Sequence, residues 1–185
     1  MEVKKCIKER RSIRHFLNKK VEFELITEIL EAGIWAPSSG NIQNWNFIVI
    51  NSKEKKEKIA KACYGKPFIA RAPYVIIVLA ETKRAEKLYG KFGKRFAIQN
   101  ISACIENMLL RTHELGLASC WIGKFEEEEI KNILNVPESI EIHAILPIGY
   151  AGEKVPAPPR KKLKTKVFFN KWGERWIKNV EKRVR

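Results

Sequence analysis

The sequence predicts a globular protein that combines α-helices with β-strands. Its 185 residues are 45% apolar, which is enough to build a substantial core. Segments with apolar residues at helical spacing alternate along the chain with short runs of β-branched residues that suit buried strands. We therefore expect one main domain, with no boundary before a proline-rich arm late in the chain.

Helices are predicted at residues 3–10, 22–37, 52–63, 95–116 and 126–135. In these segments apolar residues recur at helical spacing, or a residue that caps or stops a helix is present. Ser52 can cap the third of these helices, Pro37 stops the second and Gly116 stops the fourth. The helix at 95–116 is apolar around most of its circumference. We therefore expect it to be both the central core helix and part of a subunit interface.

Strands are predicted at residues 45–51, 74–81, 118–122 and 142–150. The segment that follows Gly152 holds three prolines in five residues, so residues 153–166 are expected to form an extended arm. Residues 168–183 are expected to form a final aromatic helix. We predict a cofactor-binding domain at 1–162 and a basic aromatic extension at 163–185, which packs on the body or on a second copy.

The net charge of +15 is concentrated at the two ends of the chain. Residues 1–20 carry eight Lys or Arg against two Glu, residues 151–185 carry twelve against three, and the middle of the chain is balanced. An anion is therefore expected where the two ends meet or against them, and nucleic acid and acidic membrane surfaces are candidates for the same reason. The chain has no aspartate, so mechanisms that need a catalytic Asp are excluded.

The sequence lacks the motifs that are typical of several classes of protein. No apolar run approaches the ~20 residues that cross a bilayer, and the first residues lack the apolar core of a secretion signal. We therefore expect a cytoplasmic protein with no membrane contact. The four cysteines form no C-x-x-C pair and the three histidines are far apart, so we expect buried thiols and no metal. The motifs G-x-S-x-G, G-x-G-x-x-G and the P-loop are absent from the sequence.

Three segments carry unusual chemistry. "RRSIRHF" at 10–16 packs three arginines around one serine, which suits either a solvated basic face or an anion socket. "APSSGNIQNW" at 36–45 is rich in hydrogen-bonding groups, although it could be an ordinary polar loop. "GLASCWIG" at 116–123 ends on a glycine whose bare N–H could approach a ligand closely.

In this order, and followed by "GYAGEKVPAPPRKK", these segments resemble the motifs of the FMN-dependent nitroreductase family from about Lys4 to Lys162. The resemblance implies an α+β fold, namely an α-β-α sandwich around a central mixed sheet. It also implies homodimers with an FMN in each of two sites at the subunit interface. The implied activity is an oxidoreductase in which NADH or NADPH reduces FMN, leaves, and is replaced by a nitroaromatic, quinone or similar small acceptor in a ping-pong scheme.

The resemblance also assigns residues. Arg10, Ser12 and Arg160, with Arg11 in support, resemble the clamp on the FMN phosphate, which arginine forks and a hydroxyl suit chemically. Arg14 resembles the residue near the flavin pyrimidine, where a cation favours hydride acceptance. Ile122 and Gly123 fall where backbone approaches the flavin N5. The loop that lies along the ring, commonly supplied by the partner subunit, corresponds to Pro37, Ser38, Ser39, Asn41 and Gln43.

With Arg14 and Gly123 tuning the ring, no side chain is expected to act as a nucleophile. Two residues depart from the family's pattern: Asn44 stands where proline is frequent, and Asn100, counted among the cofactor-binding candidates, stands where an acidic residue often sits. Both leave substrate preference open. Two alternatives remain, which are another FMN-dependent reaction such as dehalogenation or dehydrogenation, and a less favoured nucleic-acid-binding protein that uses the basic aromatic C-terminal segment.

Overall fold

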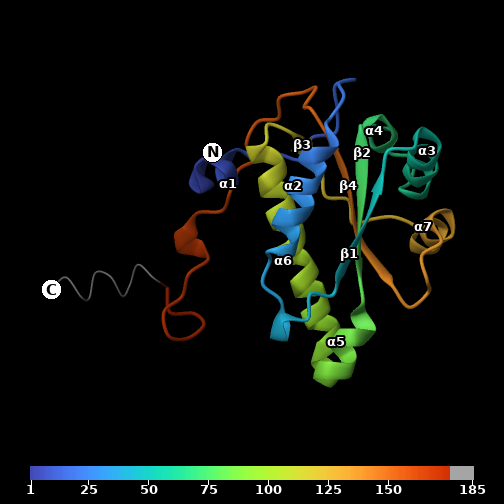
Figure 1. Ribbon diagram of the computed structural model, residues 1–185. Coiled ribbons are helices and arrows are strands. Elements are labelled where there is room, and N and C mark those ends of the chain that lie inside the picture. Colours follow the sequence, from blue (N-terminus) through green and yellow to red (C-terminus); the bar gives the residue numbers. More distant parts are fainter. Residues whose placement is uncertain (176–185) are drawn as a thin grey trace. The chain divides into compact units, whose positions relative to one another are not determined.

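The computed structural model describes residues 1–175 and places helices on both faces of a four-stranded sheet (Figure 1). The strands are β1 (Trp45–Ile50), β2 (Tyr74–Ala80), β3 (Ala118–Ser119) and β4 (Glu141–Gly149), in the order β1-β2-β4-β3. All three neighbouring pairs are antiparallel. Within residues 1–175, one parallel pairing is present, and it is an isolated bridge between Ser12 and Ser119. The predicted α+β class is confirmed.

The helices are α1 (Val3–Glu9), α2 (Phe23–Ile34), α3 (Lys53–Ala62), α4 (Pro67–Arg71), α5 (Thr82–Tyr89), α6 (Gly93–Glu114) and α7 (Glu127–Leu134), and the 3₁₀ turns are η1 (Ser39–Asn41), η2 (Gly90–Phe92) and η3 (Leu163–Thr165). As predicted, α2 ends before Pro37, and the Ser52 side chain caps α3 by accepting a hydrogen bond from the Lys55 N–H at 3.4 Å. The predicted helix at 95–116 is confirmed as α6.

Side chains of β2 alternate between two cores. Ile76 and Val78 pack with residues of α2 and α6, whereas Val75 and Ile77 pack with residues of α3, α4 and α7. Successive side chains of a strand point to opposite faces of the sheet, so helices cover both faces of β2, as Figure 1 shows. This explains its uninterrupted apolar sequence and confirms the α-β-α sandwich.

The predicted elements and the structure differ in several places. The sequence predicted neither α4 nor α5. Only Ala118–Ser119 of the predicted strand at 118–122 joins the ladder, followed by an isolated bridge between Ile122 and Ile145. The predicted terminal helix is wrong for residues 168–175, which form a turn because Asn170 (φ 60°) and Gly173 (φ 92°) adopt left-handed backbone. The rest of that predicted helix, residues 176–183, lies outside the described residues.

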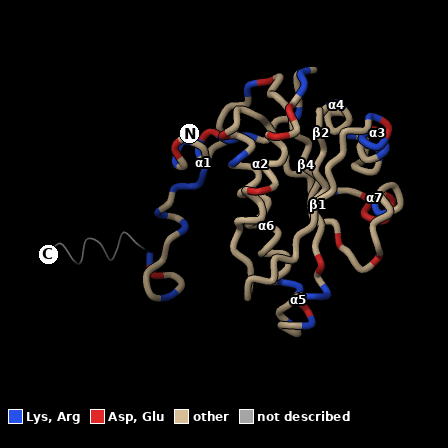
Figure 2. The backbone as a smooth tube through the Cα atoms, viewed as in Figure 1, with Lys and Arg blue, Asp and Glu red and all other residues tan. Residues whose placement is uncertain are grey.

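The chain divides into two compact units, Met1–Val155 and a second that begins at Pro156. This division lies earlier than the boundary at residue 162 suggested by the sequence, and the extent of the cofactor-binding domain stays a prediction. Figure 2 shows Lys and Arg in the first residues, on α3 and in the second unit. No helix within residues 1–175 is long and apolar enough to span a membrane.

The four cysteines are buried and unpaired, as predicted. Burial raises the pKa of the Cys63 and Cys104 thiols to about 12. These thiols therefore stay protonated and pack as small apolar groups. The described part of the chain contains no group of three His, Cys, Asp or Glu side chains that could hold a metal ion.

Candidate functional site

The arginine-rich segment at 10–16 follows α1 and is held along the edge of the sheet. The Ile13 N–H donates to the Ser119 carbonyl at 3.0 Å, next to the bridge between Ser12 and Ser119. Ile13 is buried. Ile13 packs in a cluster of buried apolar residues. Because neighbouring side chains of an extended chain point to opposite sides, Ser12 and Arg14 point away from this cluster.

Three predicted site residues influence the Cys120 thiol. Burial raises the pKa of Cys120, whereas the charge of Arg14, a hydrogen bond with Ser12 and the charge of Arg10 lower it. The bridge between Ser12 and Ser119 accounts for these effects, because it places this stretch of the arginine segment next to Cys120. The structure thus brings Arg10, Ser12 and Arg14 into one electropositive cluster, which we call the arginine cluster. Cys120 itself was read from the sequence only as a buried thiol.

The guanidinium groups of Arg10 and Arg11 differ in their contacts. Arg10 Nε lies 3.6 Å from Glu106 Oε1, which is an ion pair without hydrogen-bond geometry. Arg11 Nη1 donates to the carbonyls of Lys8 and Arg10, both at 2.7 Å. Within the described residues, both Nε atoms are buried without a hydrogen-bond acceptor. Such donors are costly unless an acceptor reaches them, so they favour an anion here.

A cavity of about 370 Å³ lies beside these arginines and is also lined by His113 and Lys154. Burial lowers the pKa of His113; the charges of Arg10 and Arg11 lower it further, while Glu9 opposes them. The neutral form of His113 is therefore favoured. The charged residues that line the cavity are then Arg10, Arg11 and Lys154, with the carboxylates of Glu9 and Glu153 opposing them.

Glu153 fixes the backbone of the arginine segment. Its Oε1 accepts hydrogen bonds from the N–H groups of Arg14 at 2.6 Å and His15 at 3.0 Å. The Gly152 N–H donates to the His15 carbonyl at 2.8 Å, and a Cβ at Gly152 would lie 2.9 Å from His15 Nδ1. The segments "GYAGE" and "RRSIRHF" are therefore in contact. Nothing in the sequence singled out Glu153.

The polar loop at 36–45 is held from behind by a buried amide pair. The Ser39 N–H and hydroxyl both donate to Asn100 Oδ1 at 3.0 Å, and Asn100 Nδ2 donates to Asn44 Oδ1 at 2.9 Å. Asn44 is 1% exposed and Asn100 is 4% exposed. The two departures from the family's pattern thus contact each other, and Asn100 lies behind Ser39, where it positions the loop.

The loop backbone is set in an unusual shape. Gly40 (φ 54°), Asn41 (φ 56°) and Gln43 (φ 46°) are left-handed, a region that side-chain-bearing residues seldom adopt. Ser38 Oγ accepts from the Gln43 N–H at 3.1 Å, and Gln43 Nε2 donates to Asn41 Oδ1 at 3.0 Å. A Cβ at Gly40 would overlap the Tyr89 hydroxyl. These contacts preorganise the loop.

The backbone N–H of Gly123, shortly after β3, is accessible. Ile122 is buried and exchanges hydrogen bonds with Ile145 at 3.1 and 3.0 Å. Gly123 is exposed, and its N–H donates to no other described residue. The nearest atom to a Cβ built there is Trp121 Nε1 at 3.9 Å. No steric contact within residues 1–175 requires a glycine at 123.

Within one chain, the arginine cluster and the loop at 36–45 do not meet. Arg10 contacts Glu106 and Ser39 contacts Asn100, both on α6. These two α6 residues are six positions apart, which is ~9 Å along the axis and ~120° around it. Figure 1 shows η1 beside the start of α6 and the residues after α1 beside its end.

The cofactor-binding roles of the predicted residues stay predictions, and for Pro37 and Arg160 the structure gives no supporting contact. Pro37 is exposed at the start of the loop. Arg160 is exposed and belongs to the second compact unit, so its part in a phosphate clamp stays a prediction.

Comparison with known proteins links this arrangement to a single family. The Nitroreductase family model matches residues 7–68 and 61–150. A protein of Methanothermobacter thermautotrophicus that carries the name "NADH dehydrogenase/NAD(P)H nitroreductase" is 34% identical over 157 residues, covering 83% of this chain and 79% of the relative. An iodotyrosine deiodinase of Thermotoga neapolitana is 23% identical over 181 residues, covering 84% and 92%. The structure of an FMN-dependent nitroreductase from Clostridium difficile R20291 superposes with a TM-score of 0.79 at 31% identity, covering 90% and 98%.

Proposed function

Because the chain belongs to the nitroreductase family, we propose that it is an FMN-dependent oxidoreductase, which takes electrons from NADH or NADPH and passes them to a small acceptor such as a nitroaromatic or a quinone. The observation that carries this proposal is the arginine cluster at the sheet edge. The relative named for NAD(P)H nitroreductase and the FMN-dependent structure support the reductant and the cofactor.

The arginine cluster fits a phosphate monoester. Such a group presents three oxygens and nearly two negative charges, which would satisfy the buried Nε donors of Arg10 and Arg11. Arg10 forms an ion pair with Glu106 but donates no hydrogen bond to it, so its donors are available to the phosphate. Ser12 adds a hydroxyl, and Arg11, already bound to its own backbone, adds its Nε. We assign Arg160 to the same clamp.

Bound FMN would supply the ring that accepts and releases the electrons. Glu153 holds the backbone of Arg14, while the Arg14 side chain is exposed and free to place its charge beside the pyrimidine. A fixed cation there favours the reduced, negatively charged ring. The accessible Gly123 N–H is assigned to donate at the opposite edge of the same site. The chain's own part is to position the reactants and exclude water.

We assign the loop at 37–43 to the cofactor site of a second copy, because it lies away from the arginine cluster of its own chain. Large apolar side chains surround this loop. Trp35 is 84% exposed, Ile34 48% and Ile98 45%, and they lie on the ends of α2 and α6 nearest η1. An interface between two copies would bury them. The proposed unit is therefore a homodimer.

If the preorganised loop covers one side of the bound ring, the nicotinamide and the acceptor must use the same binding position. We therefore propose that they bind in turn, in a ping-pong scheme. The acceptor class is the least constrained part of the proposal, since a relative with similar coverage is a deiodinase.

The proposal is tested on the purified protein. We expect a yellow protein with about one FMN per chain, which NADH or NADPH bleaches under anaerobic conditions and a nitroaromatic or quinone reoxidises. An acceptor panel that includes a halogenated tyrosine separates reductase from dehalogenase chemistry. A colourless protein that fails to bind added FMN would contradict the proposal, and salt-sensitive DNA binding by such a protein would favour the nucleic-acid alternative.

A further inference from the structure

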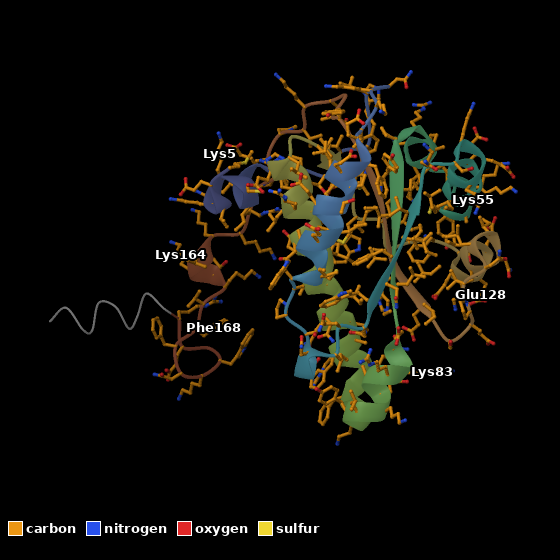
Figure 3. All side chains as sticks on the ribbon, viewed as in Figure 1. Lys5, Lys55, Lys83, Glu128, Lys164 and Phe168 are labelled. Carbon is orange, nitrogen blue, oxygen red and sulfur yellow. The ribbon has the colours of Figure 1, made fainter. Side chains whose placement is uncertain are left out.

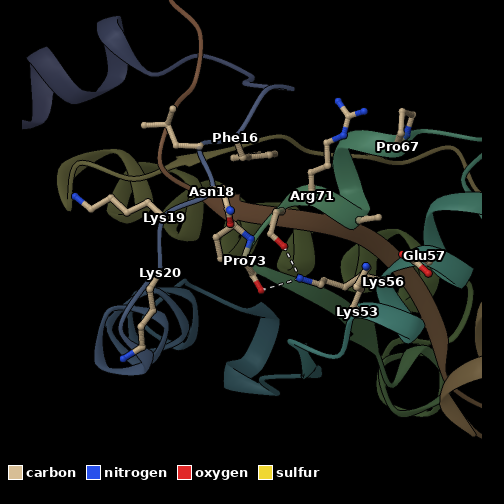
Figure 4. Close-up of a pocket in the computed structure, with 13 residues that line it drawn as sticks. Phe16, Asn18, Lys19, Lys20, Lys53, Lys56, Glu57, Pro67, Arg71 and Pro73 are labelled. Atoms are coloured by element: carbon tan, nitrogen blue, oxygen red, sulfur yellow. Dashed lines mark hydrogen bonds between the residues drawn. The ribbon is translucent and has the colours of Figure 1, made fainter.

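A second, larger cavity lies away from the candidate site just described. It has a volume of about 750 Å³ and is bounded by the chain after Phe16, the first turns of α3, and α4 with the two residues that follow it. We call it the α3–α4 pocket; Figure 4 shows it with its side chains. Its volume falls in the range of small-molecule sites.

Positive charge dominates the lining of the α3–α4 pocket. Its charged residues are Lys19, Lys20, Lys53, Lys56, Arg71 and a single carboxylate, Glu57. Among the described residues, Lys53, Lys56 and Arg71 form no ion pair. This is not true of the basic surface in general, since Lys58 on the same helix pairs with Glu54 at 2.6 Å.

Lys56 is the most informative of these residues because it is a buried cation without a carboxylate partner. It is 8% exposed, and its Nζ donates to the carbonyls of Ala72 at 2.7 Å and Pro73 at 3.1 Å (Figure 4). An ammonium has three N–H donors, so these two hydrogen bonds leave one donor for a ligand. Burial lowers the pKa of Lys56, and an anion in the pocket would oppose this shift by stabilising the charged ammonium.

The other buried lysine provides a direct contrast. Lys131 is also 8% exposed, but it pairs with Glu127 at 3.3 Å and Glu128 at 3.2 Å. Buried charges in proteins are normally paired in this way. In the α3–α4 pocket, the only lining carboxylate is Glu57, and it makes no such contact with Lys56.

The walls of the pocket are largely apolar. Phe16, Pro67, Ala70 and Pro73 supply them. An inorganic phosphate alone would leave most of 750 Å³ unfilled. A ligand that matches both the charge and the walls therefore joins a phosphate to an organic group.

We propose that the α3–α4 pocket is a second anion site, which binds a small phosphorylated organic molecule through Lys53, Lys56 and Arg71. This site is separate from the arginine cluster and does not depend on the flavin function. Lys53 and Arg71 are exposed and can close on the phosphate, while Lys56 provides the fixed charge at the base.

Calorimetric titration with AMP and with inorganic phosphate at low ionic strength tests this proposal. The protein is first saturated with FMN, so that the arginine cluster is occupied; a chain that proves to bind no flavin is titrated in the same way. We expect saturable binding of AMP, tighter than that of phosphate. Lys53→Glu should weaken AMP binding by about tenfold or more.

Two further variants make the result specific. Lys55→Glu reverses a charge on the same helix outside the pocket, where Figure 3 shows Lys55 on the outward side of α3, and it should leave AMP binding nearly unchanged. Glu57→Gln removes the only lining carboxylate and should tighten binding, a gain that misfolding cannot produce.

Three results would overturn the proposal. The first is the absence of saturable AMP binding. The second is an equal loss of binding for Lys53→Glu and Lys55→Glu, which would reflect only the net charge of the chain. The third is loss of FMN from Lys53→Glu, which would make the pocket part of the flavin site.

Discussion

Arg14 has a fixed backbone and an exposed side chain that is available to a ligand. Its backbone N–H is bound by Glu153 from a distant part of the chain, while its side chain is exposed beside the buried Cys120. Because the backbone is already fixed, only the side-chain rotamers of Arg14 have to be ordered when its guanidinium approaches a bound ring. This arrangement suits tuning of a bound ring more than it suits tight binding.

We predict that Arg14→Gln lowers the reduction potential of bound FMN by on the order of 30 mV, equal to about a tenfold change in a two-electron equilibrium. The FMN dissociation constant should change much less. Redox titration and FMN titration measure the two effects. Arg11→Gln is the control for the potential, because Arg11 is assigned to the phosphate and not to the ring; it should weaken FMN binding and leave the potential unchanged. An unchanged potential in Arg14→Gln would discard this role.

Asn100 is the residue that connects the loop to α6. It accepts two hydrogen bonds from Ser39 and donates one to Asn44. Asn100→Ala should therefore lower the free energy of unfolding by about 2–4 kcal/mol, since buried partners are left unpaired. Denaturant unfolding followed by tryptophan fluorescence measures this loss.

Asn107→Ala on the same helix is the control for the Asn100 variant. Asn107 makes one hydrogen bond, to the Ala32 carbonyl at 3.2 Å, so its removal should cost only about 1 kcal/mol. Equal losses for the two variants would show that Asn100 does not support the loop as described.

At the scale of elements, the loop at 36–45 combines backbone strain with close contact. We predict that Gly40→Ala destabilises the fold more than Gly65→Ala does. Both residues have positive φ, but a Cβ at Gly65 meets nothing within 4 Å, whereas one at Gly40 meets the Tyr89 hydroxyl. The strain common to both is about 1 kcal/mol, and the contact adds to it. Thermal unfolding compares the two.

Adding Tyr89→Phe to Gly40→Ala should recover only the part of the loss due to the contact, because the strained φ remains. If Gly40→Ala and Gly65→Ala prove equally stable, the loop is not held against α5 as the structure shows.

The elements that the sequence predicted are those with strong local signals. β2 is an unbroken apolar run, and α3 has both a cap and helical spacing. By contrast, α5 is mostly polar, and its buried Ala85 packs on Ala97 and Ile42 from other elements. That packing depends on tertiary structure, so no local pattern announces it. The aromatic residues at 168–175 favour a helix by their spacing, but Asn170 and Gly173 adopt left-handed backbone and form a turn.

The candidate site divides in the same way. Motifs identified Arg10, Ser12 and Arg14, which are neighbours in sequence and which the bridge between Ser12 and Ser119 holds together at the sheet edge. Glu153 could not be found, since it reaches Arg14 across 139 positions. The contact between Asn44 and Asn100 spans 56 positions and is equally invisible in a single sequence.

At the scale of the whole molecule, the central claim is that each cofactor site needs two copies of the chain. The arginine cluster and the loop lie on different faces of α6, and exposed apolar side chains flank the loop. One chain would therefore contain an arginine cluster and a loop that belong to two different cofactor sites.

Mixed dimers test this claim most directly. One copy carries Arg10→Gln and a different tag, and the other carries Ser39→Trp, which blocks the loop; each variant alone is expected to lose FMN. In a two-fold dimer with shared sites, the doubly tagged mixed dimer should regain about one FMN, because one site then has both intact halves. Mixed dimers that bind no FMN would contradict the account, since both sites would then be built within single chains.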